Sequence, residues 1–321
     1  MSYWKEKCKI GNLEVPRFFG APLDGVTDSP FRKLVREFSQ EELLYTEMRH
    51  VACVANEKGA KKSVTFDSIE RPLNYQFAAN KIDFIEKACD RVLEKGVDCI
   101  DLNIGCPARN IVSSGSGSAL MGDIDRLKEI LINFRARIKC IPFTVKIRAG
   151  FKSQNALDVA KLAQDCGADA IAIHPRLQTQ KFGGTPDYAL AGKIKKVATV
   201  PVFISGGIND FSDAKHVYAQ TGADGYLIGR GMWAKPWKLK EMKEHALGNE
   251  YQVDKTVILK CALAHLDNVI DFYGTDGIFC FRKHLSLYIK GLPFAAKLRE
   301  ELMTTDSVTK TKEGLIKFLG S

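Results

Sequence analysis

Short apolar runs alternate with amphipathic segments over the first 235 residues of the chain. The apolar runs have the length of buried strands, and the segments between them, such as residues 31–38 and 156–166, repeat apolar positions at helical spacing. Eight runs predict eight strands, at residues 18–23, 43–48, 73–78, 98–103, 142–147, 168–174, 200–205 and 224–228. Alternating strands and helices favour right-handed βαβ units, and eight of them predict an α/β fold, a closed (β/α)8 TIM barrel.

The pattern changes after residue 235. Residues 257–272, 279–288 and 295–303 keep helical spacing, and no strand run separates them. We therefore expect a barrel domain over residues 1–235 and a small all-helical domain over residues 236–321. The connection between Arg49 and Arg71 is longer than a simple loop and is expected to form a hairpin or a lid.

Charge and cysteine usage narrow the class of protein. The formal net charge of +9 favours a polyanionic partner. No apolar run approaches the ~18 residues of a membrane span, and the first residues lack the apolar core of a signal peptide, so we expect a cytoplasmic protein without a membrane partner. The nine cysteines are scattered and form no C-x-x-C pair, so we expect no metal site.

Polar residues and glycines stand at nearly every predicted strand end. Barrel active sites form at the carboxyl ends of the strands, so this arrangement favours an enzyme. The strand ends carry Pro22-Leu23-Asp24-Gly25, Glu47, Gln76, Asn103 with Cys106, Lys146 with Arg148, His174 with Arg176, Ser205-Gly206-Gly207, and Gly229-Arg230.

The glycine-containing ends of the last two strands predict a phosphate site. Glycines allow close approach of the backbone, and free backbone N–H groups donate to phosphate oxygens. His174 would face this site, and the amide of Gln76 suits the edge of a uracil-like or flavin ring. Lys146 alternates with apolar neighbours and would point into the barrel mouth, where the alternative to ligand binding is a salt bridge to Glu47 or Asp101.

Cys106 lies between Gly105 and Pro107, just beyond a strand end. Its position favours a thiol that takes part in chemistry, although a small buried hydrophobic role is the alternative. The small residues at 113–118 predict a mobile loop beside it.

The helical tail contains the basic segment Arg282-Lys283-His284, interleaved with aromatic residues. Basic groups combined with aromatic rings bind single-stranded or looped RNA. Taken alone, the segment fits an ordinary amphipathic helix with a solvated basic face better than an RNA-binding surface.

Taken in order, these motifs resemble the dihydrouridine synthases, flavin enzymes that reduce uridine in transfer RNA. The resemblance spans nearly the whole chain, with the strongest likeness at Asn103-Ile104-Gly105-Cys106-Pro107. It departs from the usual family pattern at Leu23, Asp24, Arg109-Asn110 and Pro175. The other matching motifs are residues 21–32, 146–148, 174–176, 205–207, 229–230 and 282–284.

The resemblance implies a barrel that binds FMN and a helical domain that binds tRNA, with NADPH or NADH as electron donor. It implies that Cys106 donates the proton to C5 of uracil. The implied cofactor contacts are Pro22, Leu23, Asp24, Gln76, Lys146, His174, Ser205, Gly206, Gly207, Gly229 and Arg230. The implied substrate contacts are Asn103, Arg148, Arg176, Arg282 and Lys283.

Three alternatives stay open from the sequence. The RNA substrate could be ribosomal rather than transfer RNA. The barrel could instead act on a free pyrimidine, as dihydroorotate dehydrogenases do, although a small substrate needs neither the basic charge nor the helical tail. The chain could also be an RNA-binding protein that has lost its chemistry. We expect a monomer.

Overall fold

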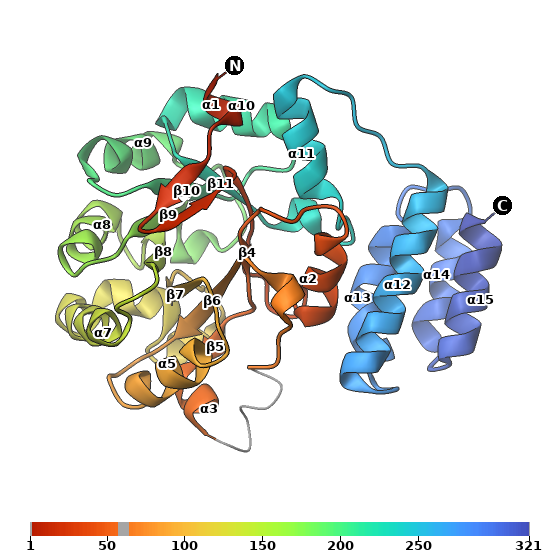
Figure 1. Cartoon of the computed structure of the whole chain (residues 1–321), viewed down its shortest axis with the longest axis horizontal. Helices are drawn as coiled ribbons and strands as arrows, with labels where there is room; N and C mark the ends of the chain where they lie inside the picture. Colours follow the sequence, from red (N-terminus) through yellow and green to blue (C-terminus); the bar gives the residue numbers. More distant parts are fainter. Residues whose placement is uncertain (1, 57–63, 321) are drawn as a thin grey trace.

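A closed barrel of parallel strands forms the larger part of the molecule (Figure 1). The computed structural model describes residues 2–56 and 64–320. Hydrogen bonding runs in the order β4-β3-β11-β10-β9-β8-β7-β6, and the pairing of β4 with β6 closes the circle. The eight strands confirm the prediction; they are β3 (Phe18–Gly20), β4 (Leu44–Tyr45), β6 (Leu73–Ala78), β7 (Cys99–Ile104), β8 (Phe143–Gly150), β9 (Ala170–Leu177), β10 (Val202–Ser205) and β11 (Gly225–Ile228).

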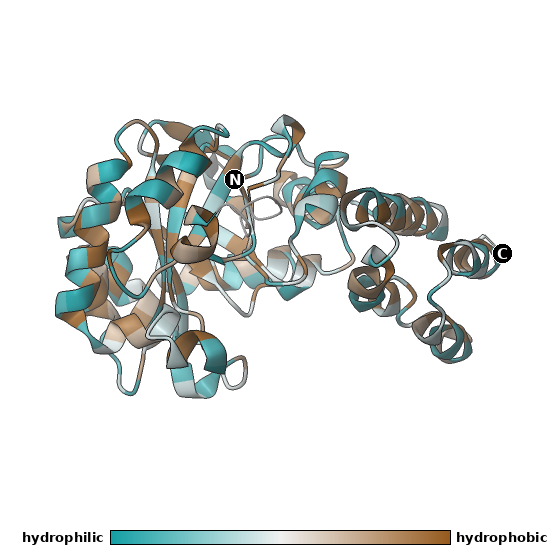
Figure 2. Cartoon of the chain, turned by 90° about the horizontal axis from the view of Figure 1, so that it is seen from below, coloured by the Kyte–Doolittle hydropathy of each residue, from teal (hydrophilic) through white to brown (hydrophobic). Residues whose placement is uncertain are grey.

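Helices surround the barrel and bury their apolar faces against it. Figure 2 shows hydrophobic and hydrophilic stripes alternating along the helices. Aspartates begin four of them by accepting a backbone N–H: Asp28, Asp123, Asp187 and Asp210 cap α2, α7, α9 and α10. The barrel helices are α2 (Ser29–Arg36), α5 (Ile85–Leu93), α7 (Ile124–Arg137), α8 (Ala156–Asp165), α9 (Tyr188–Val197), α10 (Phe211–Thr221) and α11 (Lys238–Leu247).

Several short elements complete the barrel domain. The helical turns α6 and η2 follow β7, and the small-residue stretch at 113–118 runs from the end of α6, through a turn at 114–116, into the start of η2. The short elements are α1 (Ser2–Lys5), α3 (Val51–Ala55), α6 (Arg109–Ser113), and the 3₁₀ turns η1 (Ser68–Glu70), η2 (Gly117–Gly122), η3 (Gln178–Gln180) and η4 (Arg230–Met232).

An N-terminal hairpin that the sequence pattern did not predict closes the amino end of the barrel. Its antiparallel strands are β1 (Cys8–Ile10) and β2 (Leu13–Val15). Cys8, Ile10 and Val15 pack in one buried cluster with residues of β9, β10 and β11. Since this end is filled, the carboxyl end of the barrel is left for a cavity.

The connection after β4 begins with a further short strand. The predicted strand 43–48 is shortened to β4, and β5 (Arg49–His50) follows it; both pair with β6. The short helix α3 and the turn η1 follow, so the described parts of 49–71 contain no hairpin. Residues 57–63 lie outside the described residues.

The helical domain is a group of helices beside α2 (Figure 1). Its members form one buried cluster that includes Leu34 of α2. Three helices were predicted and are confirmed, and α15 is additional: the domain has α12 (Lys255–Tyr273), α13 (Gly277–Tyr288), α14 (Ala295–Thr304) and α15 (Val308–Leu319).

Helix α11 belongs to the barrel by its packing. Its Leu239, Met242 and Ala246 lie in the main core of the barrel. The sequence-based division after residue 235 assigned this helix to the helical domain. We therefore propose the domain boundary between α11 and α12.

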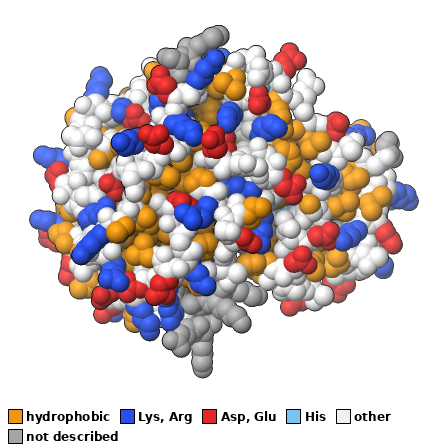
Figure 3. Space-filling view, viewed as in Figure 1, with side chains coloured by type: hydrophobic (Ala, Val, Ile, Leu, Met, Phe, Trp, Pro, Cys, Tyr) orange, Lys and Arg blue, Asp and Glu red, His pale blue; other side chains and the backbone are white. Residues whose placement is uncertain are grey.

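Charges of both signs are interspersed on the face shown in Figure 3. The net positive charge of the chain is thus not gathered into one continuous basic patch on this face. Within residues 2–56 and 64–320, no helix combines the length and the hydrophobicity that crossing a membrane requires.

Candidate active site

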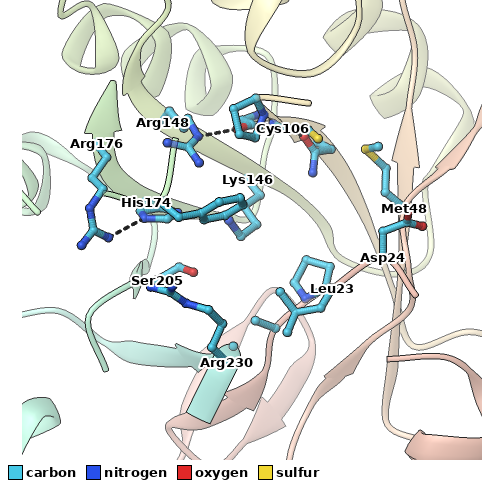
Figure 4. A pocket seen from close by; sticks show the side chains of 18 of the residues that line it. Leu23, Asp24, Met48, Cys106, Lys146, Arg148, His174, Arg176, Ser205 and Arg230 are labelled. Atoms are coloured by element: carbon cyan, nitrogen blue, oxygen red, sulfur yellow. Dashed lines mark hydrogen bonds between the residues drawn. The ribbon is translucent and has the colours of Figure 1, made fainter. Parts of the chain in front are cut away.

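The barrel opens at the carboxyl ends of its strands into a cavity of about 630 Å³. Figure 4 shows side chains from different strands pointing into it. Every barrel residue that the sequence predicted for the site lines this cavity. They are Pro22, Leu23, Asp24, Gln76, Asn103, Cys106, Lys146, Arg148, His174, Arg176, Ser205, Gly206, Gly207, Gly229 and Arg230.

A chain of buried hydrogen bonds supports the Cys106 turn. Asp101 Oδ2 accepts from Gln76 Nε2 at 2.8 Å, and Gln76 Oε1 accepts from Asn103 Nδ2 at 2.9 Å. Asn103 Oδ1 then accepts from the backbone N–H groups of Gly105 and Cys106, at 3.0 and 2.8 Å. Gln76 and Asp101 are opposite each other in the register of β6 and β7, which makes the first bond possible. This network aims the turn that carries the thiol.

Cys106 itself is half-buried at the mouth of the cavity. Burial raises the pKa of its thiol above the ordinary value, and this outweighs the nearby cation Lys146 and the backbone N–H of Ala108. Ser118 donates from both its backbone nitrogen and its hydroxyl to the Cys106 carbonyl, at 3.1 and 2.8 Å. The thiol is therefore protonated at neutral pH and held in place by its surroundings.

Lys146 lies at the centre of the cavity (Figure 4). The alternative of a salt bridge is not observed: Glu47 pairs with Arg49 at 2.7 Å, and Asp101 is bonded to Gln76 and Thr144. Across the described residues, the Lys146 ammonium has no ion pair. Burial, and then the neighbouring Arg148, lower its pKa to about 8. Lys146 is a desolvated cation that an anionic ligand would stabilise.

The last two strand ends form a cradle for an anion. Gly206 and Gly207 have φ angles of +94° and +79°, a region that favours glycine. A Cβ atom on Gly206 would lie 2.5 Å from His174 Nε2, and one on Gly207 would collide with the Tyr188 hydroxyl. In the described part of the chain, the backbone N–H groups of Gly206, Gly207 and Arg230 have no acceptor. These free donors fit a phosphate group.

His174 faces the cradle as a neutral ring. Arg176 Nη1 lies 2.9 Å from His174 Nε2, and because a guanidinium can only donate, Nε2 accepts and Nδ1 carries the proton. Burial, and then the surrounding cations beginning with Lys146, lower the pKa of His174 to about 2. His174 can thus donate a hydrogen bond from Nδ1 but adds no charge.

Two predicted substrate contacts, Arg148 and Arg176, are engaged in holding loops. Arg148 donates to the carbonyls of Gly105 and Lys181, both at 2.7 Å. Arg176 donates twice to the carbonyl of Gly184, at 3.0 and 2.8 Å. Both arginines therefore fix the segment after β9, and their contact with substrate stays a prediction.

That segment brings in Phe182, which the sequence analysis missed. Its side chain is 55% exposed and lines the cavity. The Phe182 ring lies 5.6 Å from the Arg148 guanidinium and 5.9 Å from that of Arg230. An aromatic residue in an irregular loop has no periodic signal, so the pattern of the sequence could not single it out.

Asp24, one of the departures from the family pattern, forms an ion pair with Arg49, a residue that the sequence analysis did not single out. Arg49 Nη1 lies 3.2 Å from Asp24 Oδ1, while Arg49 Nη2 contacts Glu47. The added negative charge at Asp24 is thus paired at the rim of the cavity.

The two residues predicted to contact RNA from the helical domain, Arg282 and Lys283, differ in whether the charged group is already held by the protein. Arg282 on α13 donates to the Thr305 carbonyl at 2.9 Å and stacks on Phe279, so it helps hold the helical domain together. Lys283 is exposed, and its ammonium lies over Gly25 at the edge of the barrel. Of the two, Lys283 is the better placed to meet an RNA.

Comparisons with known proteins agree with this arrangement. The family model described as dihydrouridine synthase matches residues 19–320. The chain is 32% identical to a probable tRNA-dihydrouridine synthase 1 of Synechocystis sp., over 97% of this chain and 88% of that protein. It is also 32% identical to tRNA-dihydrouridine synthase B of Pseudomonas aeruginosa, over 93% of this chain and 92% of that protein.

A solved structure supports the fold. A histamine dehydrogenase from Rhizobium sp. 4-9 is similar to 83% of this chain with a TM-score of 0.59, and the match covers 51% of that longer chain. The 13% sequence identity limits this likeness to the barrel architecture. The family match covers nearly the whole chain and includes every strand end that lines the cavity. The chain belongs to the dihydrouridine synthase family.

Proposed function

We propose that the protein is a tRNA-dihydrouridine synthase that reduces the C5–C6 bond of uridines in tRNA, with FMN as cofactor and NADPH or NADH as electron donor. One observation carries the proposal: a protonated thiol, an unpaired ammonium and a glycine cradle face the same cavity. The names of the relatives in Synechocystis sp. and Pseudomonas aeruginosa support tRNA as the substrate. The monomeric state and the cytoplasmic location stay predictions.

The cavity fits FMN in size and in charge. Ligand pockets generally measure about 300–1,000 Å³, and this one measures about 630 Å³. Its phosphate end consists of free backbone donors beside glycines whose missing side chains leave room. The phosphate would be held by Ser205, Gly206, Gly207, Gly229 and Arg230 with His174 beside it, and the ring by Pro22, Leu23, Asp24, Gln76 and Lys146.

The roles of the protein's own groups follow from their protonation states. FMN bound here, once reduced by NADPH or NADH, would supply a hydride to C6 of uracil. Negative charge then develops on C5 and O4, and Cys106, protonated because of its burial, donates its proton to C5. Each carbon of the former double bond gains one hydrogen, and the thiolate regains a proton from solvent. Lys146 would stabilise negative charge at the edge of the flavin ring.

The RNA side of the site is also part of the proposal. The uridine must leave its stack to reach the cavity, at a cost of a few kcal/mol, which favours a target in a loop. Asn103 would contact the base through the one amide hydrogen that it does not donate to Gln76. Lys283 would contact the RNA backbone as it runs from the barrel mouth toward α13.

The test separates the two halves of the reaction. The FMN-loaded protein is reduced anaerobically with NADPH and then mixed with unmodified tRNA, and the return of flavin absorbance is followed. We expect Cys106→Ala to bind FMN and to be reduced at the wild-type rate, but to transfer electrons to tRNA about 10²–10⁴-fold more slowly. Unchanged transfer would exclude Cys106 as the acid.

Matched controls make the result specific. Cys140→Ala removes an exposed thiol outside the cavity and should leave both rates unchanged. Ribosomal RNA fragments and free uridine or orotate, offered in place of tRNA as electron acceptors, address the two other substrates. Faster turnover with either of them would replace tRNA in the proposal.

A further inference from the structure

The turn between β3 and α2, residues 22–28, forms one wall of the cavity. Pro22, Leu23, Asp24 and Val26 all line the cavity. The turn is short and is held from within, because the Leu23 backbone N–H donates to the Thr27 hydroxyl at 2.9 Å. It contains only one glycine, Gly25, with a φ of +70°. The position of this wall therefore depends on the residues that hold the turn from the barrel side and from the side of the helical domain.

On the barrel side, Glu47 holds the middle of the turn. Its Oε1 accepts from the Gly25 backbone N–H at 2.6 Å, and its Oε2 is paired with Arg49. Arg49 in turn reaches Asp24. The barrel thus restrains the tip of the wall through one buried carboxylate and one arginine.

On the other side, the helical domain reaches the end of the turn at Asp28. Asp28 Oδ2 accepts from the Tyr273 hydroxyl, at the end of α12, at 3.1 Å. Asp28 Oδ1 accepts from the Phe31 backbone N–H at 3.1 Å and so caps α2. One buried carboxylate therefore joins the cavity wall, the start of α2 and the helical domain.

This contact lies in a packed joint rather than at an exposed edge. Asp28 is only 8% exposed, and Phe31 of α2 packs against the rings of His265 and His284 from α12 and α13. A buried carboxylate depends strongly on each hydrogen bond that it accepts. The nearby Lys283 adds a second point of approach, since a side chain on Gly25 would collide with its ammonium.

We propose that Tyr273 is a positioning residue, which through Asp28 sets the wall of the cavity, so that the docking of the helical domain controls cofactor binding in the barrel. The link to cofactor binding rests on the proposed function, whereas the control of the wall does not. Coupling of this kind is reciprocal. A ligand bound against the turn would therefore also strengthen the contact between α12 and the barrel.

Tyr273→Phe removes the hydroxyl and keeps the ring. In the full-length protein without FMN, NADPH or RNA, we expect the backbone amides of residues 23–28 to exchange with deuterium about tenfold faster than in wild type. The Kd for FMN, measured from flavin fluorescence, should rise several-fold. The Kd for tRNA should stay within about twofold, because the helical domain keeps its fold. Tyr251→Phe, at a tyrosine that packs on Lys240, is the matched control.

A second variant makes the route through Asp28 testable. Asp28→Ala removes the acceptor of both the Tyr273 hydroxyl and the Phe31 backbone N–H, so it should reproduce the faster exchange, and the double variant should be no worse than the more affected single variant. Wild-type exchange in Tyr273→Phe, or additive effects in the double variant, would overturn the proposal. Faster exchange in a protein that reduces no RNA would leave Tyr273 as the positioning residue and remove the proposed function instead.

Discussion

Asn103 supports the Cys106 turn, and replacing it with alanine separates the support from the thiol itself. Asn103 accepts from two backbone N–H groups, those of Gly105 and Cys106, and donates to Gln76. Asn103→Ala would leave these three groups without their partner in a place that is 8% exposed. A buried polar group without a partner costs about 1–3 kcal/mol, and the open cavity gives water some access. We therefore expect a loss of about 2–4 kcal/mol in the free energy of unfolding.

The same change should disturb the chemistry. With the N–H groups of the turn released, the thiol of Cys106 is no longer aimed into the cavity, so we expect electron transfer from the reduced protein to tRNA to slow by about 10²-fold or more. Unfolding in urea gives the stability, and the anaerobic mixing experiment gives the rate. The rate at which NADPH reduces the flavin should change little, because Asn103 aims the acid Cys106, which acts only in the later transfer to tRNA.

Two further variants show whether the network is the cause. Asn103→Asp keeps an oxygen that can accept from the N–H groups of Gly105 and Cys106, so it should retain more of the transfer rate to tRNA than the alanine variant. Its second oxygen faces the Gln76 carbonyl oxygen, so it should still lose stability. Asn133→Ala removes a partly exposed asparagine on α7 whose amide bonds only to the backbone of its own helix, and it should cost less than about 0.5 kcal/mol. If Asn103→Ala were as stable as Asn133→Ala, the hydrogen bonds would not be what holds the turn.

Three other predictions concern the cofactor cradle and the RNA. Lys146 has a pKa of about 8, lowered from 10.5, so its charge is lost as the pH rises through 8. FMN affinity of the wild type should fall over that range. A Lys146→Met variant whose FMN affinity has the same pH profile as the wild type would contradict this. Gly206→Ala should weaken FMN binding at least about tenfold, because its Cβ would meet His174. Gly222→Ala, with positive φ but open space, controls for backbone strain, and equal losses in both would refute the cradle. Lys283→Ala should raise the KM for tRNA and lower the slope of its logarithm against the logarithm of salt concentration by about 1, the value for one phosphate contact. Arg282→Ala should mainly lower the free energy of unfolding. An unchanged salt slope for Lys283→Ala would assign Lys283 to a solvated helix face.

The strand ends were predictable from the sequence because they depend on local pattern. Apolar runs bury themselves, and parallel strands bring their carboxyl ends to one face. Once eight runs were recognised, the meeting of Gln76, Cys106, Lys146 and Gly206 at one cavity followed from topology alone. The hairpin β1–β2 was missed because strands of three residues are too short to show a period.

The tasks of individual polar side chains could not be predicted in the same way. Arg148 and Arg176 stand at strand ends like the other site residues, yet their guanidinium groups hold the loop that carries Phe182. Helix α11 looks like the helices that follow it, yet its apolar face lies in the barrel core. In each case the partner is distant in the sequence.

The sequence by itself determined the barrel, the cavity's place and the residue types that reach it, because hydrophobic period and strand order are properties of the chain. Only the tertiary structure decided which groups satisfy one another. Asp101 is bonded to Gln76 by the register of β6 on β7, and Asp28 is bonded to Tyr273 by the docking of α12 on α2. A hydrogen bond requires its two atoms to lie about 3 Å apart, and only the packed fold sets that distance.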